Sequence, residues 1–81
     1  MSGSNLHYAD LTGANLRGAT VEADVRHASF VNADLANADF THADLRGADL
    51  AGANLSKTLG GLGGLLPRGY VVNAGYIERL K

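Results

Sequence analysis

The side chains best suited to chemistry in this 81-residue chain are carboxylates and histidines. Aspartates recur every five or ten residues from Asp24 to Asp49. A glycoside hydrolase needs two carboxylates held about 5–10 Å apart with separated pKa values. Regular spacing along the chain does not focus two carboxylates on one point. It predicts instead that these side chains hydrogen-bond to the backbone near turns and so serve the scaffold.

The histidines and hydroxyls give no stronger indication of catalysis. His7, His27 and His42 show neither the HxH nor the HxxxH spacing typical of a metal site, and we expect them to lie solvated at corners. Nothing in the sequence places Ser29 or Ser56 beside a base. The chain has no cysteine for a disulfide or a thiolate site. We therefore expect no catalytic residue, no metal and no cofactor, and predict that the protein is not an enzyme.

From Ser4 to Lys57 the sequence repeats itself every five residues. Of eleven units, ten begin with Ala, the first begins with Ser, and all carry Leu, Val or Phe in third place. The unit at Ala19–Glu22 has only four residues. A fixed short period is typical of stacked repeat architectures, in which single units cannot bury their apolar groups alone.

The five-residue period fits neither an amphipathic helix nor an alternating strand. The apolar first and third residues are two apart, as in a short extended segment. The remaining residues must turn a corner, and Gly or Asn often stands at the fifth position, where both suit turns. The sequence thus predicts a coil whose stacked turns form one continuous apolar column.

These A(D/N)LxG-type units resemble the pentapeptide repeat family over residues 4–57. The resemblance implies an all-β fold: a right-handed quadrilateral β-helix with four units per coil, here slightly under three coils. It also implies that the third residues fill the core, together with the small first residues. Besides Leu6, the core residues so predicted are Leu11, Leu16, Val21, Val25, Phe30, Leu35, Phe40, Leu45, Leu50 and Leu55.

The sequence divides into three segments: the repeats over residues 1–58, a Gly-rich loop over 59–69 and a β-hairpin over 70–81. The loop lacks GxGxxG and GK(S/T), so we expect it to lay Leu62, Leu65 and Leu66 over the end of the tube rather than to bind phosphate. Asn-Ala-Gly between two β-prone runs predicts the hairpin turn at Gly75. The hairpin either caps the tube or docks onto a partner.

If units four apart stack, one face of the tube is richer in charged and aromatic groups than the others. It carries His7, Arg26 and Arg46, with Tyr8, His27 and Gly47 at the adjoining corner. Two tyrosines of the C-terminal segment join them as candidates for contact with a partner. The candidate interaction residues are Tyr8, Arg26, His27, Arg46, Tyr70 and Tyr76.

The four-residue unit lacks its corner residue, so the chain must tighten or bulge there. This is either a tolerated surface irregularity or a kink that brings Glu22 and Asp24 together on a contact surface. The sequence leaves both interpretations open.

Charge and composition restrict the setting of the protein. The net charge of −1 divides into −3 over residues 1–58 and +2 over 59–81, which does not predict direct nucleic-acid binding. No apolar run approaches the roughly 20 residues of a membrane span, and the N-terminus lacks a signal pattern. We expect no membrane partner and a location in the cytoplasm or in a particle assembled there.

The sequence is compatible with functions of three different classes. The favoured one is a structural or protein-interaction module, a rigid β-helical tile that docks onto itself or a larger assembly, such as a phage particle as accessory or decoration protein. Its contacts would be the coil ends and the hairpin, with the N-terminal end covered by another copy or a partner. The alternative, implied by the family resemblance, is a DNA-mimicking modulator of DNA gyrase. A tube about 13 Å tall whose acids are interrupted by Arg26 and Arg46 suits that role poorly. An enzyme is the third, and lacks any catalytic cluster.

Overall fold

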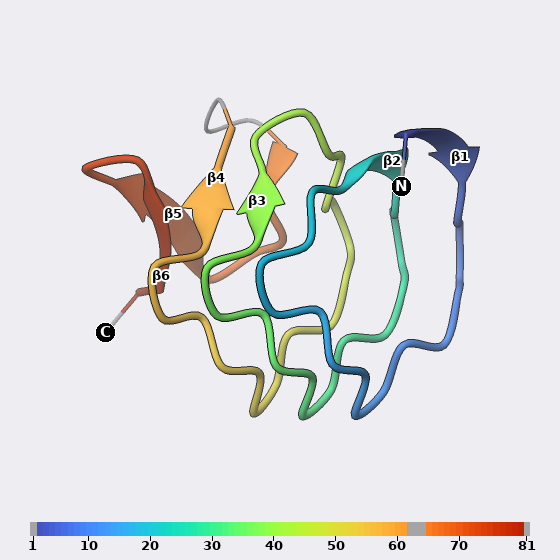
Figure 1. Cartoon of the computed structure of the whole chain (residues 1–81), viewed down its shortest axis with the longest axis horizontal. Helices are drawn as coiled ribbons and strands as arrows, with labels where there is room; N and C mark the ends of the chain where they lie inside the picture. Colours follow the sequence, from blue (N-terminus) through green and yellow to red (C-terminus); the bar gives the residue numbers. More distant parts are fainter. Residues whose placement is uncertain (1, 62–64, 81) are drawn as a thin grey trace.

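The computed structural model describes residues 2–61 and 65–80, with side chains from residue 5 onward. Figure 1 shows the chain winding into stacked turns, followed by a hairpin at one end. Within these described ranges the named secondary-structure elements are all β-strands. The strands are β1 (Ser2–Asn5), β2 (Glu22–Asp24), β3 (Asp39–Phe40), β4 (Leu59–Gly60), β5 (Tyr70–Asn73) and β6 (Tyr76–Arg79).

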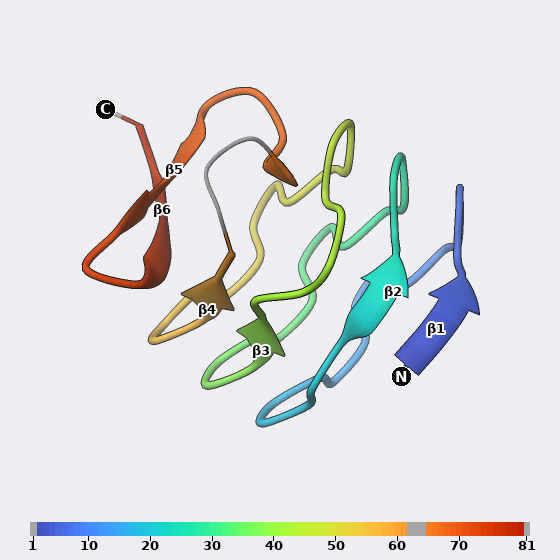
Figure 2. The same cartoon turned by 90° about the horizontal axis from the view of Figure 1, so that it is seen from above.

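Successive turns of the chain pair in parallel at a fixed register. Asp24 bridges Asp44, and Ser29 bridges Asp49, so each contact joins residues 20 apart. Seen from above, the layers lie side by side along one axis (Figure 2). Each layer donates hydrogen bonds to the next; the Phe30 N–H, for example, donates to the Asp49 carbonyl at 2.8 Å. The fold is therefore an all-β solenoid, as the repeat pattern predicts.

The four-residue unit at 19–22 shortens this register by one residue. Pairs that span it, such as Asp10 with Ser29, are 19 apart instead of 20. Between Ser2 and Asn5, β1 uses one residue more than β2 uses between Glu22 and Asp24, which makes a β-bulge. The chain thus runs through the missing corner in extended form, and the bulge lies on the opposite strand.

The third residue of each unit points to the axis of the solenoid. Phe30 and Phe40 meet edge to face, with ring centroids 5.7 Å apart and planes at 84°. Leu6, Leu11, Leu16 and Leu55 are only half-buried, because the outermost layers have a neighbour on one side alone. The fully buried third residues are Val21, Val25, Phe30, Leu35, Phe40, Leu45 and Leu50.

The corners require a left-handed backbone at the fifth residue of most units. Positive φ values occur at glycines such as Gly13 and also at Asn32, Asn37 and Tyr8. Glycine and asparagine adopt this region at low cost, which explains their frequency there. The apolar spacing and the corner residues therefore specify the same coil.

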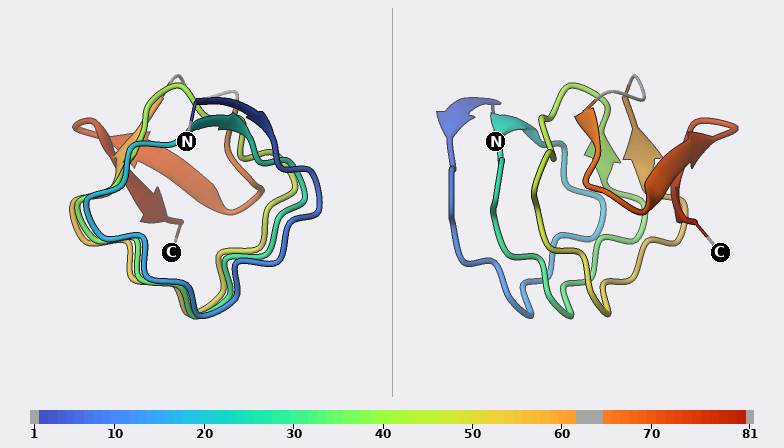
Figure 3. Two further views of the ribbon diagram at one scale, coloured as in Figure 1. Left: turned by 45° about the vertical axis from the view of Figure 1, so that its right-hand side comes forward. Right: turned by 180° about the vertical axis from the view of Figure 1, so that it is seen from behind.

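The hairpin of β5 and β6 closes the C-terminal end. The strands of this sheet lie in the order β3-β4-β6-β5, and the two-residue turn at Ala74 and Gly75 has φ of 53° and 88°. Figure 3 shows the hairpin crossing the end of the tube. Ile77 is buried there against Gly60, where an added Cβ would lie 2.7 Å from Ile77. Glycine is therefore needed at position 60 for the hairpin to dock.

The Gly-rich loop contributes to the same closure. The Leu65 carbonyl accepts a hydrogen bond from the Leu45 N–H at 2.9 Å. Leu66 is half-buried and packs against the core. Leu62, the third leucine predicted to cover this end, lies outside the described residues.

Replacement of Phe40 tests the inward assignment. Phe40→Ala should lower the free energy of unfolding by about 3–5 kcal/mol, which for so small a domain is much of its total stability. Phe40→Asp should prevent folding, because a buried charge without a partner is very costly. Urea unfolding followed by circular dichroism measures both. The exposed Ser56→Ala is the control and should unfold like the parent chain; a β-type spectrum for Phe40→Asp would contradict the assignment.

Candidate functional site

In most units the polar second residue folds back onto its own turn. The Asp24 Oδ1 accepts the Arg26 N–H at 3.2 Å, and the Asp44 Oδ1 accepts the Arg46 N–H at 3.1 Å. Asn5 does the same for His7 at 3.2 Å. This confirms that the periodic Asp and Asn side chains serve the turns. The turn geometry also fixes where the next side chains point.

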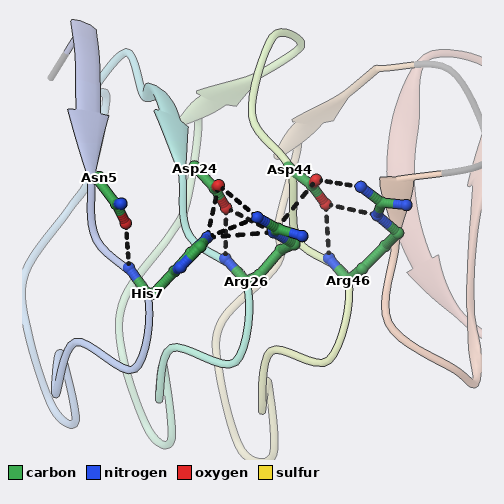
Figure 4. Close-up of polar contacts among 6 residues, drawn as sticks. All are labelled: Asn5, His7, Asp24, Arg26, Asp44 and Arg46. Atoms are coloured by element: carbon green, nitrogen blue, oxygen red, sulfur yellow. Dashed lines mark hydrogen bonds and ion pairs between the residues drawn. The ribbon is translucent and has the colours of Figure 1, made fainter.

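On one face these turns stack, so that acidic and basic side chains alternate along the axis, with one of each in the second and third layers. The order along the axis is His7, Asp24, Arg26, Asp44 and Arg46, which we name the charge ladder (Figure 4). Arg26 donates to both carboxylate oxygens of Asp24 at 3.0 Å. Its Nε also lies 3.8 Å from the Asp44 Oδ2 in the next layer. Each carboxylate therefore holds its own turn and links neighbouring layers.

The two ends of the charge ladder differ. At the N-terminal end the Nε2 of His7 lies 2.5 Å from the Asp24 Oδ2 and 2.9 Å from the Arg26 Nη2. At the other end Arg46 donates to Asp44 through Nη2 at 2.6 Å and through Nε at 2.9 Å. The Asp44 side chain is largely covered, whereas about half of the Arg46 side chain is exposed. Arg46 is thus the charge of this face most open to solvent.

The ion pairs shift the acid–base behaviour of the charge ladder. Hydrogen bonds from Arg26 hold the pKa of Asp24 well below its usual range, although partial desolvation opposes them. Hydrogen bonds from Arg46 lower the pKa of Asp44 in the same way. The pKa values of Arg26 and Arg46 are raised by the same partners. All four groups are therefore charged at neutral pH, and their charges cancel.

Beside the charge ladder, a column of rings covers one corner. Tyr8 and His27 stack with centroids 5.0 Å apart and planes at 11°, and both have φ of 61°. In the third layer an added Cβ on Gly47 would lie 2.4 Å from the His27 Nδ1. The imidazole therefore lies over Gly47, and this close contact together with a φ of 74° favours glycine there. The column leaves Tyr8 as the most exposed large hydrophobic side chain of the described residues, at 75%.

The structure brings four of the six candidate interaction residues together. Tyr8, Arg26, His27 and Arg46 share the face just described. The two tyrosines of the hairpin separate: Tyr70 is half-buried against the core, and Tyr76 is 38% exposed. Tyr70 therefore belongs to the cap rather than to a free surface, because it pairs with Arg79 on the side of the hairpin that carries Ile77.

Sequence reasoning missed Arg79, which completes the cap. Its Nη2 donates to the carbonyls of Leu50 at 3.0 Å and Ala53 at 2.8 Å. In the layer below, the equivalent Ala33 carbonyl accepts the backbone N–H of Asn54 at 2.9 Å. The guanidinium thus takes the place of the backbone N–H that a next layer would have donated to Ala53. It also lies 5.8 Å from the centroid of the Tyr70 ring. The sequence did hold one signal for this contact. Residues two apart on a strand face the same side, so the hairpin pattern puts Arg79 on the same side as Ile77.

In the described part of the chain, no three His, Cys, Asp or Glu residues are grouped to hold a metal ion. The same ranges contain no helical segment with the length and apolarity needed to cross a bilayer. The charge ladder is neutralised internally, so its Arg side chains are already engaged with carboxylates.

Comparisons with known proteins agree with the repeat geometry. The family model for pentapeptide repeats matches eight copies over residues 1–20 and 21–56. A crystal structure of a pentapeptide repeat protein from the thylakoid lumen of Arabidopsis thaliana is 45% identical, with a TM-score of 0.68. The match covers 70% of this chain and 40% of that protein, so the present chain corresponds to less than half of its length. No curated protein shows significant similarity.

The lowered carboxyl pKa values predict acid sensitivity. Unfolded aspartates have a pKa near 3.9, and Asp24 and Asp44 titrate lower in the folded state. Their contribution to stability is therefore complete above about pH 5 and is lost as the pH falls below 4 toward their folded pKa values. Chemical unfolding between pH 7 and pH 2 should show this decline.

Asp24→Asn isolates the ionic part of that effect. Asparagine can still accept the turn hydrogen bond, as Asn5 and Asn15 do, but it removes the charge that pairs with Arg26. The variant should fold, be somewhat less stable at pH 7 and lose less stability on acidification. An acid profile identical to that of the parent chain would contradict a structural role for the charge ladder.

Proposed function

The chain belongs to the pentapeptide repeat family, and we propose that it is a non-catalytic protein-interaction module. In this proposal the solenoid is a rigid tile, and the C-terminal hairpin is the part that docks onto a larger protein assembly. Register spacings of 19 and 20 residues support four units per coil. Together with the family resemblance, they support a right-handed four-sided solenoid of slightly under three coils.

One observation carries the proposal: the outer face of the hairpin exposes several large apolar side chains, beside the polar Asn73 and Glu78. Val71, Tyr76 and Leu80 alternate with the buried Ile77 and therefore face away from the tube. They are 37%, 38% and 60% exposed, and Leu59, the cross-strand neighbour of Tyr76, is 37% exposed. We name these four residues the hairpin patch. Exposed large apolar side chains that gather on one face mark sites of protein contact.

The hairpin patch is held in a fixed geometry, which favours recognition. β6 is tied to the last coil by the Ile77 N–H, which donates to the Thr58 carbonyl at 2.8 Å, and by Arg79. Beside the patch, on the same face of the hairpin, the Asn73 amide donates to Glu78 at 3.2 Å. A preformed surface loses little conformational freedom on binding, so modest apolar area can suffice for affinity.

The alternative of a DNA-mimicking gyrase modulator receives less support. Such a role needs a continuous acidic surface, since duplex DNA carries a charge about every 1.7 Å along its axis. Here Asp24 and Asp44 pair with Arg26 and Arg46, and Asp34 pairs with Arg17 at 3.0 Å. These cations interrupt any acidic pattern. Family members are in general structural or interaction modules, which also argues against an enzyme.

The proposed setting is an assembly formed in the cytoplasm, for which a phage particle is one example. A small rigid tile that presents one apolar patch suits an accessory or decoration role on a larger surface. This setting and the identity of the assembly stay predictions.

An affinity pull-down from the native source with quantitative mass spectrometry tests the proposal. The double variant Tyr76→Ser/Leu80→Ser should capture at least about tenfold less partner than the parent chain, because it removes apolar contact area. Tyr8→Gly is the matched control: it removes an exposed tyrosine at the other end and should capture the partner normally. Equal capture by all three proteins would overturn the proposal, and gyrase as the captured partner, with inhibition of supercoiling, would favour the alternative.

A further inference from the structure

The edge of the first layer, opposite the hairpin, shows a regular pattern of backbone groups. In the second layer, the Ser29 N–H donates to the Ala9 carbonyl at 2.9 Å, and the Ser29 carbonyl accepts the Leu11 N–H at 2.8 Å. Asp34 pairs likewise with Ala14 and Leu16. The second residue of a unit therefore directs both its N–H and its C=O toward the preceding layer.

Asp10 and Asn15 hold this position in the first layer, where they stack on Ser29 and Asp34. Their N–H and C=O groups consequently point out of the solenoid, and among residues 2–61 and 65–80 no backbone partner faces them. The apolar column ends beside them, with Leu6, Leu11 and Leu16 half-buried. This edge thus combines unpaired strand groups with apolar area, as an edge poised for pairing does.

We propose that this edge pairs head to head with the same edge of a second copy of the chain. The inference rests on the proposed function in treating the chain as an interaction module, and it names a second partner at the opposite end. A residue that presents both N–H and C=O on one side can exchange both bonds with an antiparallel neighbour. A two-fold axis across the tube generates such antiparallel neighbours, and two-fold dimers are the commonest oligomers.

The other end of the solenoid does not offer a second copy the same opportunity. There the Leu45 N–H is taken by Leu65, the Thr58 carbonyl by Ile77, and the carbonyls of Leu50 and Ala53 by Arg79. A head-to-tail stack would have to displace the hairpin. The head-to-head arrangement leaves the hairpin patch free at both ends of the dimer.

The helical rise fixes where the axis passes. The chain climbs by one layer in each coil, so the open edge of the first coil is a ramp and not a flat ring. Two such ramps stay at a constant separation all the way round only if the two-fold axis of the dimer crosses the middle of the first coil, near Gly13. Asp10 then lies opposite Asn15 of the second copy, and Arg17 of that copy lies diagonally next to Asp10. Opposite charges in such cross-strand positions are favourable. Arg17 has the freedom to respond, since more than half of its side chain is exposed.

The size of the edge predicts a weak, reversible dimer. The tube is about 22 Å across in both directions, which corresponds to roughly 500 Å² per copy, or about 1,000 Å² for the pair. This lies below the usual range of about 1,200–2,000 Å² for stable complexes. We therefore expect association in the upper micromolar range.

Sedimentation equilibrium from micromolar to millimolar concentration, on the full chain, tests the dimer. The parent chain should show a reversible monomer–dimer equilibrium. Arg17→Glu should raise the dissociation constant at least about tenfold, because it places an acid beside Asp10 of the other copy. Arg68→Glu is the matched Arg-to-Glu change, on an exposed residue of the C-terminal segment outside the charge ladder, and should leave the dissociation constant within about twofold of the parent value.

A charge swap separates a contact from a folding defect. Asp10→Lys added to Arg17→Glu should restore dimerisation, with circular dichroism showing that each variant is folded. A strictly monomeric parent chain, failure of the swap to rescue a folded variant, or weakening by Arg68→Glu but not by Arg17→Glu would overturn the head-to-head dimer. The pull-down depends on Tyr76 and Leu80 at the far end, so either proposal can fail without the other.

Discussion

The register between successive coils is the constraint on which the rest of the structure depends. A leucine or phenylalanine in one unit is buried only when the units before and after it in the stack lie directly against it. Leu35, in the middle layer, is buried, whereas Leu16 and Leu55, in the outer layers, are half-buried although they occupy the same position of the unit. Burial is therefore a property of the stack and not of the unit, as expected for a solenoid whose repeats stabilise their neighbours. The two ends are consequently the places where third-position side chains stay partly exposed.

Local and long-range interactions reinforce this register. Asp24 accepts the hydrogen bond that closes its own turn, and the same carboxylate binds Arg26 and approaches His7 of the preceding layer. The corner glycines are set by backbone φ, and Gly47 additionally by the ring of His27 above it. A single residue thus makes both a contact within its own turn and a contact with a neighbouring layer. Such agreement between levels is what makes a short repeat specify one fold.

Much of the fold, and part of the site, follows from the sequence because both are periodic. The five-residue spacing predicts the column of third residues and the alignment of His7, Arg26 and Arg46. It could not predict Arg79, whose guanidinium replaces a backbone donor, since that contact depends on where a hairpin crosses the tube. Nor could it place the bulge on β1, because the missing residue lies in the opposite strand. The inward position of Tyr70 and the outward one of Tyr76 likewise depend on how the hairpin docks.

Amide hydrogen exchange by NMR tests the stacking register most directly. The N–H groups of Leu35 and Asn37 donate to the carbonyls of Asn54 and Ser56 in the next layer, both at 2.9 Å. Leu55 and Lys57 hold the same positions in the last layer, where no described residue accepts their hydrogen bonds. Stacked layers predict that the first pair exchanges only through global unfolding and the second pair orders of magnitude faster. Equal exchange rates for the two pairs would contradict a fold held together by register between coils.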